Sequence, residues 1–169
     1  MKDSYLGEIL ESTRNSVSDK KKNFPLTKLE SELRHLESTR GFRDGLMKSL
    51  EQNSIAVIAE MKKASPSQGL IREKYEPEAI AKDYEKANAS CLSILTNEPF
   101  FKGHLRHLSL VRSYVALPLL RKDFIIDEYQ VYESRCGGAD CILLIVAALT
   151  QNQLNDYFQL AIELNLDVL

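Results

Sequence analysis

The chain has 169 residues, of which 44% are hydrophobic and 27% are charged, which is the composition of an ordinary globular protein with a sizeable core. Its formal net charge is −2, from 22 Lys+Arg against 24 Asp+Glu, so it lacks the basic excess that nucleic-acid binding requires, and we expect a small-molecule partner instead. No stretch approaches the roughly 20 apolar residues that cross a bilayer, and the polar start lacks the apolar run of a signal peptide; the sequence therefore predicts a cytoplasmic protein that does not bind membranes.

Residues 1–50 are predicted to form an N-terminal helical extension. An amphipathic segment with Ile9 and Leu10 leads to the lysines 20–22, a break follows at Phe24-Pro25, and a second helical stretch covers 26–36. Three like charges without interleaved aromatic residues are typical of a solvated helix face. We expect the extension to cap the domain that follows or to cover a ligand.

Residues 51–169 alternate between apolar runs and helical patterns. The apolar runs predict strands at Ile55–Met61, Cys91–Leu95, Leu117–Leu120, Cys141–Ile145 and Asp167–Leu169. Between them, four helices are predicted: from Pro77 to about Asn88; around Leu105, Leu108, Val111 and Val115; from Glu128 to Cys136, stopped by Gly137-Gly138; and after a Thr150–Gln153 capping box, with Leu154, Phe158, Ala161 and Ile162. Each strand is thus followed by a helix.

This repeat predicts a parallel sheet. The strand markers Val57, Cys91, Pro118, Cys141 and Asp167 lie 34, 27, 23 and 26 residues apart. Such spacing fits either an open doubly wound sheet or a closed barrel. No G-x-G-x-x-G follows the first strand, which disfavours a dinucleotide-binding open sheet and favours the barrel.

Charged residues end two of the apolar runs. Glu60 and Lys62 are two residues apart, so a strand sends both side chains to the same face, and Lys122 ends another apolar run. The ends of buried strands carry the active sites of α/β proteins. These three residues are therefore the first candidates for a site.

Metal and disulfide chemistry are not expected. Cys91, Cys136 and Cys141 are an odd set, and two of them begin apolar strands, so free thiols in a reducing compartment are favoured. His104 and His107 have a spacing that a metal site would allow, but no carboxylate or cysteine cluster accompanies them. Solvated histidines on a helix surface are the better interpretation.

Four ordered motifs resemble a known family, the indole-3-glycerol phosphate synthases of tryptophan biosynthesis. They are AEMKKASPS at 59–67, SILTNEPFFKG at 93–103, LRKDFIID at 120–127 and GADCILLI at 138–145. The resemblance implies a (βα)8 TIM barrel with an N-terminal helical extension. It also implies a carboxy-lyase, without metal or organic cofactor, that closes the ring of the phosphosugar 1-(2-carboxyphenylamino)-1-deoxyribulose 5-phosphate and releases carbon dioxide and water.

The resemblance also implies roles for individual residues. Lys122 would be the general acid at the ribulose carbonyl, Lys62 would pair with substrate charge and assist proton transfer, and Glu60 would orient the lysines and hold their charge. The family further implies substrate binding by Ser65, Ser67, Phe101, Phe124 and Leu143, the last three around the anthranilate ring. From the residues alone, Ser-Pro-Ser is a common turn and the apolar residues are ordinary core.

Asp167–Leu169 reads as the start of a fifth strand, so we expect an extension plus about four βα units of a truncated barrel. The family's general-base glutamate and glycine-rich phosphate site would lie beyond Leu169, and the isolated chain is expected to be inactive. The alternative is a catalytically inactive half-barrel that acts as a folding or assembly module. Phosphoribosylanthranilate isomerase is disfavoured by the paired-lysine motifs and the long extension. Uncovered sheet edges, and an inward face that contains Ile58 and Leu120, would favour self-association.

Overall fold

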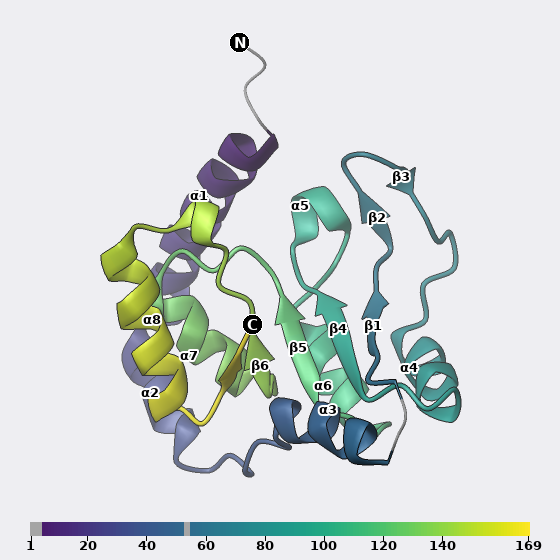
Figure 1. Cartoon of the computed structure of the whole chain (residues 1–169). Helices are drawn as coiled ribbons and strands as arrows, with labels where there is room; N and C mark the ends of the chain where they lie inside the picture. The colour runs from purple at the N-terminus through teal and green to yellow at the C-terminus, as the bar shows by residue number, and fades with distance from the viewer. Residues whose placement is uncertain (1–4, 53–54) are drawn as a thin grey trace.

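A computed structural model describes residues 5–52 and 55–169, and its centre is a five-stranded parallel sheet (Figure 1). The strand order is β1-β4-β5-β6-β7, with β1 at Ile58–Met61, β4 at Cys91–Leu95, β5 at Leu119–Lys122, β6 at Cys141–Ile142 and β7 at Asp167–Val168. Consecutive strands are joined through α4 (Pro77–Lys86), α6 (Arg106–Arg112), α7 (Glu128–Cys136) and α8 (Gln151–Glu163). The predicted parallel βα repeat is confirmed, and the architecture is that of a partial α/β barrel.

The sheet has a helix-covered face and a concave face, because side chains alternate along each strand. On the helix-covered face, buried strand residues pack with residues of the helices; this core includes Met61, Leu92, Ile94, Leu119, Ile142, Ile80, Leu108, Val111 and Val131. The opposite set from the same strands, including Glu60, Ser93 and Lys122, points to the concave face. The candidate site therefore lies on the concave side.

The N-terminal extension contains a third helix that the sequence did not predict, α3 at Phe42–Glu51. Phe42 is only 2% exposed and packs on the concave face against Cys91, Leu120 and Cys141, with Leu46 and Ile58 around them. Leu120 is thus buried and Ile58 is partly buried, and the expectation of an uncovered inward face is wrong for this part of the sheet. Close packing of α3 requires Gly45, where an added Cβ would lie 3.0 Å from Pro118 Cγ.

Two acidic residues fix the start of α3 to the sheet. The fully buried Asp140 accepts a hydrogen bond from Arg40 N (2.8 Å), and it also accepts from Leu119 N and Arg112 Nη1 (2.8 Å each). Asp167 of β7 accepts from Arg43 N (2.9 Å), in the first turn of the helix. The helix therefore has a defined position under the amino-terminal ends of the strands.

The first two helices, α1 (Tyr5–Asn23) and α2 (Leu26–Leu33), pack on α7 through a small core of Val17, Leu29 and Tyr129. The predicted solvated lysine face is wrong for two of its three residues. Lys20 Nζ lies 2.7 Å from Glu133 Oε1 and Lys21 Nζ lies 2.7 Å from Asp127 Oδ1, both on or beside α7. Because these lysines dock α1, only the exposed Lys22 matches the expectation.

Three strands have limits that differ from the predicted ones by more than one residue. β1 begins at Ile58 because Ser90 Oγ, rather than a strand, accepts the hydrogen bond of Val57 N (3.0 Å). β5 runs two residues further than predicted, since the charge of Arg121 is neutralised by buried carboxylates instead of ending the strand. β6 covers only Cys141–Ile142, and a short 3-10 helix, η1, follows at Val146–Ala148.

The predicted limits of the helices agree with the structure more closely than those of the strands. The Thr150–Gln153 capping box is formed, α7 spans Glu128–Cys136 as predicted, and Gly138 beyond it has φ of +90°. α4 ends two residues early, with Asn88 in the left-handed region (φ 59°). On α8, Ala161 is buried, whereas Phe158 and Ile162 are exposed although they continue its apolar pattern.

Two small elements above the sheet were not predicted. A hairpin of β2 (Ala64–Ser65) and β3 (Gly69–Leu70) follows β1, and α5 (Glu98–Phe101) follows β4. The hairpin and α5 contact each other, at the carboxyl ends of the strands (Figure 1). Within residues 5–52 and 55–169, no helix is long and apolar enough to cross a membrane.

Candidate functional site

The candidate site is built on the carboxyl ends of β1 and β5. Glu60 Oε1 lies 2.8 Å from Lys62 Nζ, and Glu60 Oε2 lies 3.0 Å from Lys122 Nζ. Strand β4 lies between β1 and β5, so Lys122 reaches across one strand to Glu60. The structure thus brings together the three residues that the sequence singled out.

Each of the three side chains keeps between 32% and 35% of its surface exposed, so the group is accessible to a small molecule. Partial burial of Glu60 alone raises the pKa of its carboxyl. The hydrogen bonds and positive charges of Lys62 and Lys122 outweigh this effect, and the net pKa of Glu60 is lowered from its ordinary value. At neutral pH the site therefore holds one carboxylate between two amines.

Two tyrosines hold the backbone at the end of β1. Tyr84 Oη donates to the carbonyl of Glu60 and Tyr75 Oη donates to that of Met61, each at 3.3 Å. Desolvation raises the pKa of Tyr75 to about 12, so its hydroxyl remains a donor. Ser93 is the partner of Glu60 in the β1–β4 register; its hydroxyl is buried and has no hydrogen-bond partner among the described residues.

Two aromatic rings lie together beyond the strand ends. Phe101 ends α5 and Phe124 follows β5, and their ring centroids are 6.3 Å apart. Both side chains are half-buried, which suits the wall of an apolar pocket better than a closed core. Phe101 is held by the cap of α5, where Asn97 Oδ1 accepts from Phe100 N (3.2 Å).

The predicted serines lie in the hairpin that follows β1. Ser65 is buried in β2 and its Oγ accepts from Gln68 N (3.2 Å), whereas Ser67 is exposed in the turn. Their hydroxyls are 3.4 Å apart. Since Ser65 Oγ already stabilises the turn, Ser67 is the freer of the two groups.

Leu143 follows β6 and packs against the concave-face cluster around Phe42 and Leu120. This packing is the ordinary core role that the sequence left open for it. The cluster that contains Leu143 includes neither Phe101 nor Phe124, which lie beside each other.

A set of four charged residues, which we term the back-face network, lies on the other side of β5. It consists of Lys20, Arg121, Asp123 and Glu133. Arg121 is 2% exposed; its Nη2 lies 2.8 Å from Glu133 Oε2 and 3.2 Å from Asp123 Oδ2. Burial by itself would lower the pKa of Arg121, but Glu133 and Asp123 raise it above its ordinary value, and the guanidinium stays charged.

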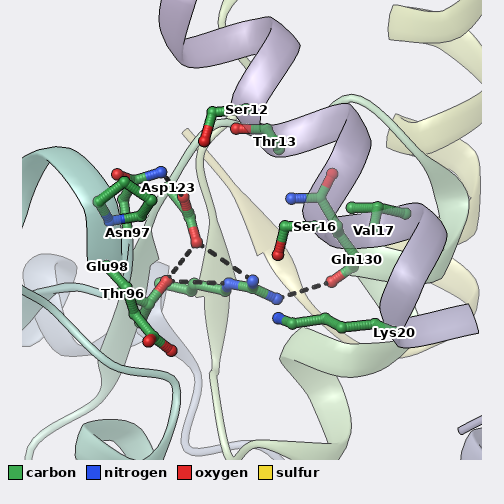
Figure 2. A pocket seen from close by; sticks show the side chains of 12 residues that line it. Ser12, Thr13, Ser16, Val17, Lys20, Thr96, Asn97, Glu98, Asp123 and Gln130 are labelled. Atoms are coloured by element: carbon green, nitrogen blue, oxygen red, sulfur yellow. Dashed lines mark hydrogen bonds and ion pairs between the residues drawn. The ribbon is translucent and has the colours of Figure 1, made fainter. Parts of the chain in front are cut away.

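The network borders a cavity of about 170 Å³ between α1 and the loops after β4 and β5 (Figure 2). Ser12, Ser16 and Lys20 of α1 face Thr96, Asp123 and Gln130 across it (Figure 2). Sequence reasoning missed this network. A buried arginine beside an aspartate in an apolar strand is a weak signal, and Lys20, which binds Glu133, lies 113 residues before it in the chain.

The histidines are more buried than expected. The ring of His107 lies tilted against that of Tyr75, with centroids 5.4 Å apart; its Nδ1 is buried, and desolvation lowers its pKa. A carboxylate does accompany the pair, because His104 Nε2 lies 3.3 Å from Glu98 Oε1. In the described part of the chain, no group of three or more His, Cys, Asp or Glu residues could hold a metal ion.

The cysteines are free thiols, as predicted. Cys91 and Cys141 are buried on the concave face, and Cys136 is half-buried beside α2. Desolvation raises the pKa of Cys91 to about 12 and that of Cys136 to about 11. Thiols of this kind are unreactive at neutral pH.

Comparison with known proteins shows the family to which the chain belongs. Residues 6–169 match the family model described as indole-3-glycerol phosphate synthase. The chain is 50% identical over 165 residues to the indole-3-glycerol phosphate synthase of Chlorobium phaeovibrioides, and 46% identical over 166 residues to that of Zymomonas mobilis subsp. pomaceae. Each alignment covers 98% of this chain and 63% of the relative's length. The chain belongs to the indole-3-glycerol phosphate synthase family.

Proposed function

We propose that this chain supplies the proton-donating part of an indole-3-glycerol phosphate synthase. The reaction closes the indole ring of 1-(2-carboxyphenylamino)-1-deoxyribulose 5-phosphate and releases carbon dioxide and water. The observation that carries the proposal is the pair of hydrogen bonds by which one carboxylate, Glu60, holds both Lys62 and Lys122 at the carboxyl ends of β1 and β5.

Lys122 is the proposed general acid. Ring closure forms a bond from the aromatic carbon to the ribulose carbonyl carbon, which places negative charge on the carbonyl oxygen, and an ammonium at that oxygen supplies the proton. Lys122 ends β5 on the concave face, half-exposed and fixed by Glu60, so its amine is directed into the space above the strands. Phe124, two residues further on, would place the anthranilate ring beside it, together with Phe101.

Lys62 has the complementary role of holding the negative charge of the substrate and assisting proton transfer. It shares Glu60 with Lys122, so a substrate anion that draws Lys62 away leaves Glu60 to orient Lys122 alone. Ser67, and less directly Ser65, would contact the substrate from the hairpin. The packing of Leu143 gives it a smaller part in the pocket than the two phenylalanines.

A chimera tests the proposal. Residues 1–169 would replace the matching segment of the C. phaeovibrioides relative, and indole-3-glycerol phosphate formation would be followed by product fluorescence. We expect turnover within about tenfold of the parent relative, because a functional segment keeps its reacting groups within the narrow geometry that catalysis requires. A folded chimera without turnover would contradict the proposed function.

Three substitutions in the active chimera then test the proposed catalytic roles of Lys122 and Lys62. Lys122→Met should lower kcat by about 10²–10⁴, the usual loss for a general acid, with KM within about tenfold. Lys122→Arg should restore little, because a guanidinium does not give up its proton. Lys62→Met should raise KM more than Lys122→Met does. A near-normal kcat for Lys122→Met would move the acid role to Lys62.

A further inference from the structure

The back-face network stands directly behind Lys122, yet the proposed reaction uses none of its side chains. Arg121, Asp123 and Glu133 have side chains only 2% to 8% exposed. Burying ions costs free energy that their pairing often only offsets, and apolar residues of similar volume are frequently as stabilising. Stability is therefore a weak reason for three buried charges at this place, and their geometry suggests a role in positioning Lys122.

The network brackets Lys122 from both sides. Arg121 and Asp123, its neighbours in sequence, are joined to each other and to Thr96 in the loop after β4. Thr96 Oγ1 donates to Asp123 Oδ2 (2.6 Å) and accepts from Arg121 Nε (3.2 Å), while Thr96 N donates to the carbonyl of Lys122 (3.2 Å). One residue thus fixes the backbone of Lys122 and both flanking side chains.

The carboxylate of Asp123 also holds the segments that carry the two aromatic rings, Phe101 and Phe124. Asp123 Oδ1 accepts from Phe124 N (2.9 Å) and from Asn97 Nδ2 (3.4 Å). Asn97 in turn caps α5, the helix that ends in Phe101. Asp123 therefore contacts the backbone before one ring and the capping residue of the helix that carries the other.

Two further links connect this unit to the helices outside the sheet. Glu133 of α7 binds Arg121 with Oε2 (2.8 Å) and Lys20 of α1 with Oε1 (2.7 Å). Arg121 Nη1 donates to the carbonyl of Gln130 and to Ser134 Oγ, at 3.1 Å each. Figure 2 places Lys20 on α1, facing the cavity that Asp123 and Thr96 also line.

We propose that Asp123 is a positioning residue: held by Arg121 and Thr96, it fixes the direction of Lys122 and the separation of Phe101 and Phe124. Glu133 and Lys20 anchor Arg121 from α7 and α1. The catalytic meaning of Lys122 rests on the proposed function, whereas the geometric coupling is a property of the chain itself and has its own measurement.

The chain alone supplies the first measurement. The lowered pKa of Glu60 depends on its hydrogen bond from Lys122, so it reports whether Lys122 is in place. Carboxyl NMR titration of Glu60 is compared in the wild type, Asp123→Asn, Thr96→Val and Lys122→Met. We expect the first two variants to move the pKa of Glu60 at least halfway towards the Lys122→Met value, since each disrupts the side-chain hydrogen bond between Thr96 and Asp123 that holds the segment around Lys122.

The second measurement is kinetic and uses the active chimera. In Asp123→Asn, kcat per folded molecule should fall about 10- to 100-fold, because small displacements of a reacting group cost that much, and KM should change less than kcat. A merely structural role would lower the melting temperature and leave kcat per folded molecule unchanged. Thr96→Val, which keeps the side-chain volume, should show the same split to a smaller degree.

Asp127→Asn is the matched control, because Asp127 lies in the same loop, pairs with Lys21 and caps α7 through Tyr129 N, a cap that asparagine also forms. It should leave the pKa of Glu60 unchanged and kcat within about twofold. The proposal is overturned if Asp123→Asn and Thr96→Val both leave the pKa of Glu60 at its wild-type value; if Asp123→Asn does not fold, Thr96→Val decides. A moved pKa with an inactive wild-type chimera supports the positioning of Lys122 and contradicts the proposed function.

Discussion

At the scale of single residues, Glu60 is the group whose ionisation can be followed without a substrate. Its folded-state pKa is lowered, because the hydrogen bonds of Lys62 and Lys122 outweigh its desolvation. A carboxyl with a depressed pKa contributes stability above its unfolded pKa, near 4.5, and loses that contribution as the pH falls through the folded value. The ion group should therefore stabilise the fold at neutral pH and fail in acid.

We predict that Lys122→Met and Lys62→Met each raise the pKa of Glu60 and reduce the stability that is lost between neutral pH and the acid range. Urea unfolding at several pH values from 7 down to 3 measures the loss. Lys74→Met is the control, because Lys74 pairs with Glu76 on an exposed surface, where such pairs contribute little. Parallel pH curves for Lys122→Met and the wild type would show that Lys122 does not hold Glu60 in solution.

Some residues of the site can be predicted from their neighbours in sequence, whereas others depend on contacts between distant segments. Glu60 and Lys62 could be placed on one face from strand alternation alone, and the structure joins them as expected. That Lys122 meets them depends on strand order, which the family motifs implied and the local pattern did not. Asp123 was missed because its partners Thr96 and Arg121 come together only when β4 and β5 pair.

At the scale of elements, α3 is the feature that most changes the expected picture. Its apolar residues Phe42, Leu46, Met47 and Leu50 have helical spacing, but the stretch is short and contains Gly45, and its pattern does not show that the helix is buried against the sheet. Its position is decided by tertiary contacts with Cys91 and Leu120. The start of α8, by contrast, is determined locally, because Thr150 and Gln153 form its capping box within one turn. The sequence is therefore enough to predict it.

We predict that Phe42→Ala lowers the free energy of unfolding by about 3–5 kcal/mol, the usual cost of deleting a buried phenylalanine. Phe42 is 2% exposed and fills the concave face against Cys91, Leu120 and Cys141. Met47→Ala, on the same helix but 41% exposed, should change stability by less than about 0.5 kcal/mol. Equal effects of the two substitutions, measured in urea, would contradict the docking of α3.

At the scale of the whole molecule, the sheet of the described chain keeps β1 and β7 as its two edges. α3 covers part of the concave face, so the edges are the main surfaces left for association. Exposed apolar residues lie next to both, with Ile55 84% and Val57 43% exposed before β1 and Leu169 54% exposed after β7. The regular βα repeat let the sequence predict this sheet, but not which part of it the extension covers.

We predict that the chain associates through the β1 edge at micromolar concentrations. The double substitution Ile55→Lys with Val57→Lys should reduce the mass seen by light scattering towards that of one chain, because charge on an edge strand disfavours edge pairing. Tyr5→Lys, a 64% exposed site at the start of α1, is the control and should leave the association unchanged. A wild-type chain with the mass of a single copy at all concentrations would contradict the prediction.

The long-range anchors of the extension also set the order in which a nascent chain completes its fold. Lys20 binds Glu133, which is synthesised 113 residues later. The partners of Arg40 and Arg43, Asp140 and Asp167, follow after 100 and 124 residues. At roughly 5–20 residues per second of synthesis, the first helices leave the ribosome about 5 to 25 s before their partners exist. Phe42 and Val17 are without their buried environment during that interval, so translation itself creates a window in which chaperones compete with the unfinished sheet for the same apolar side chains.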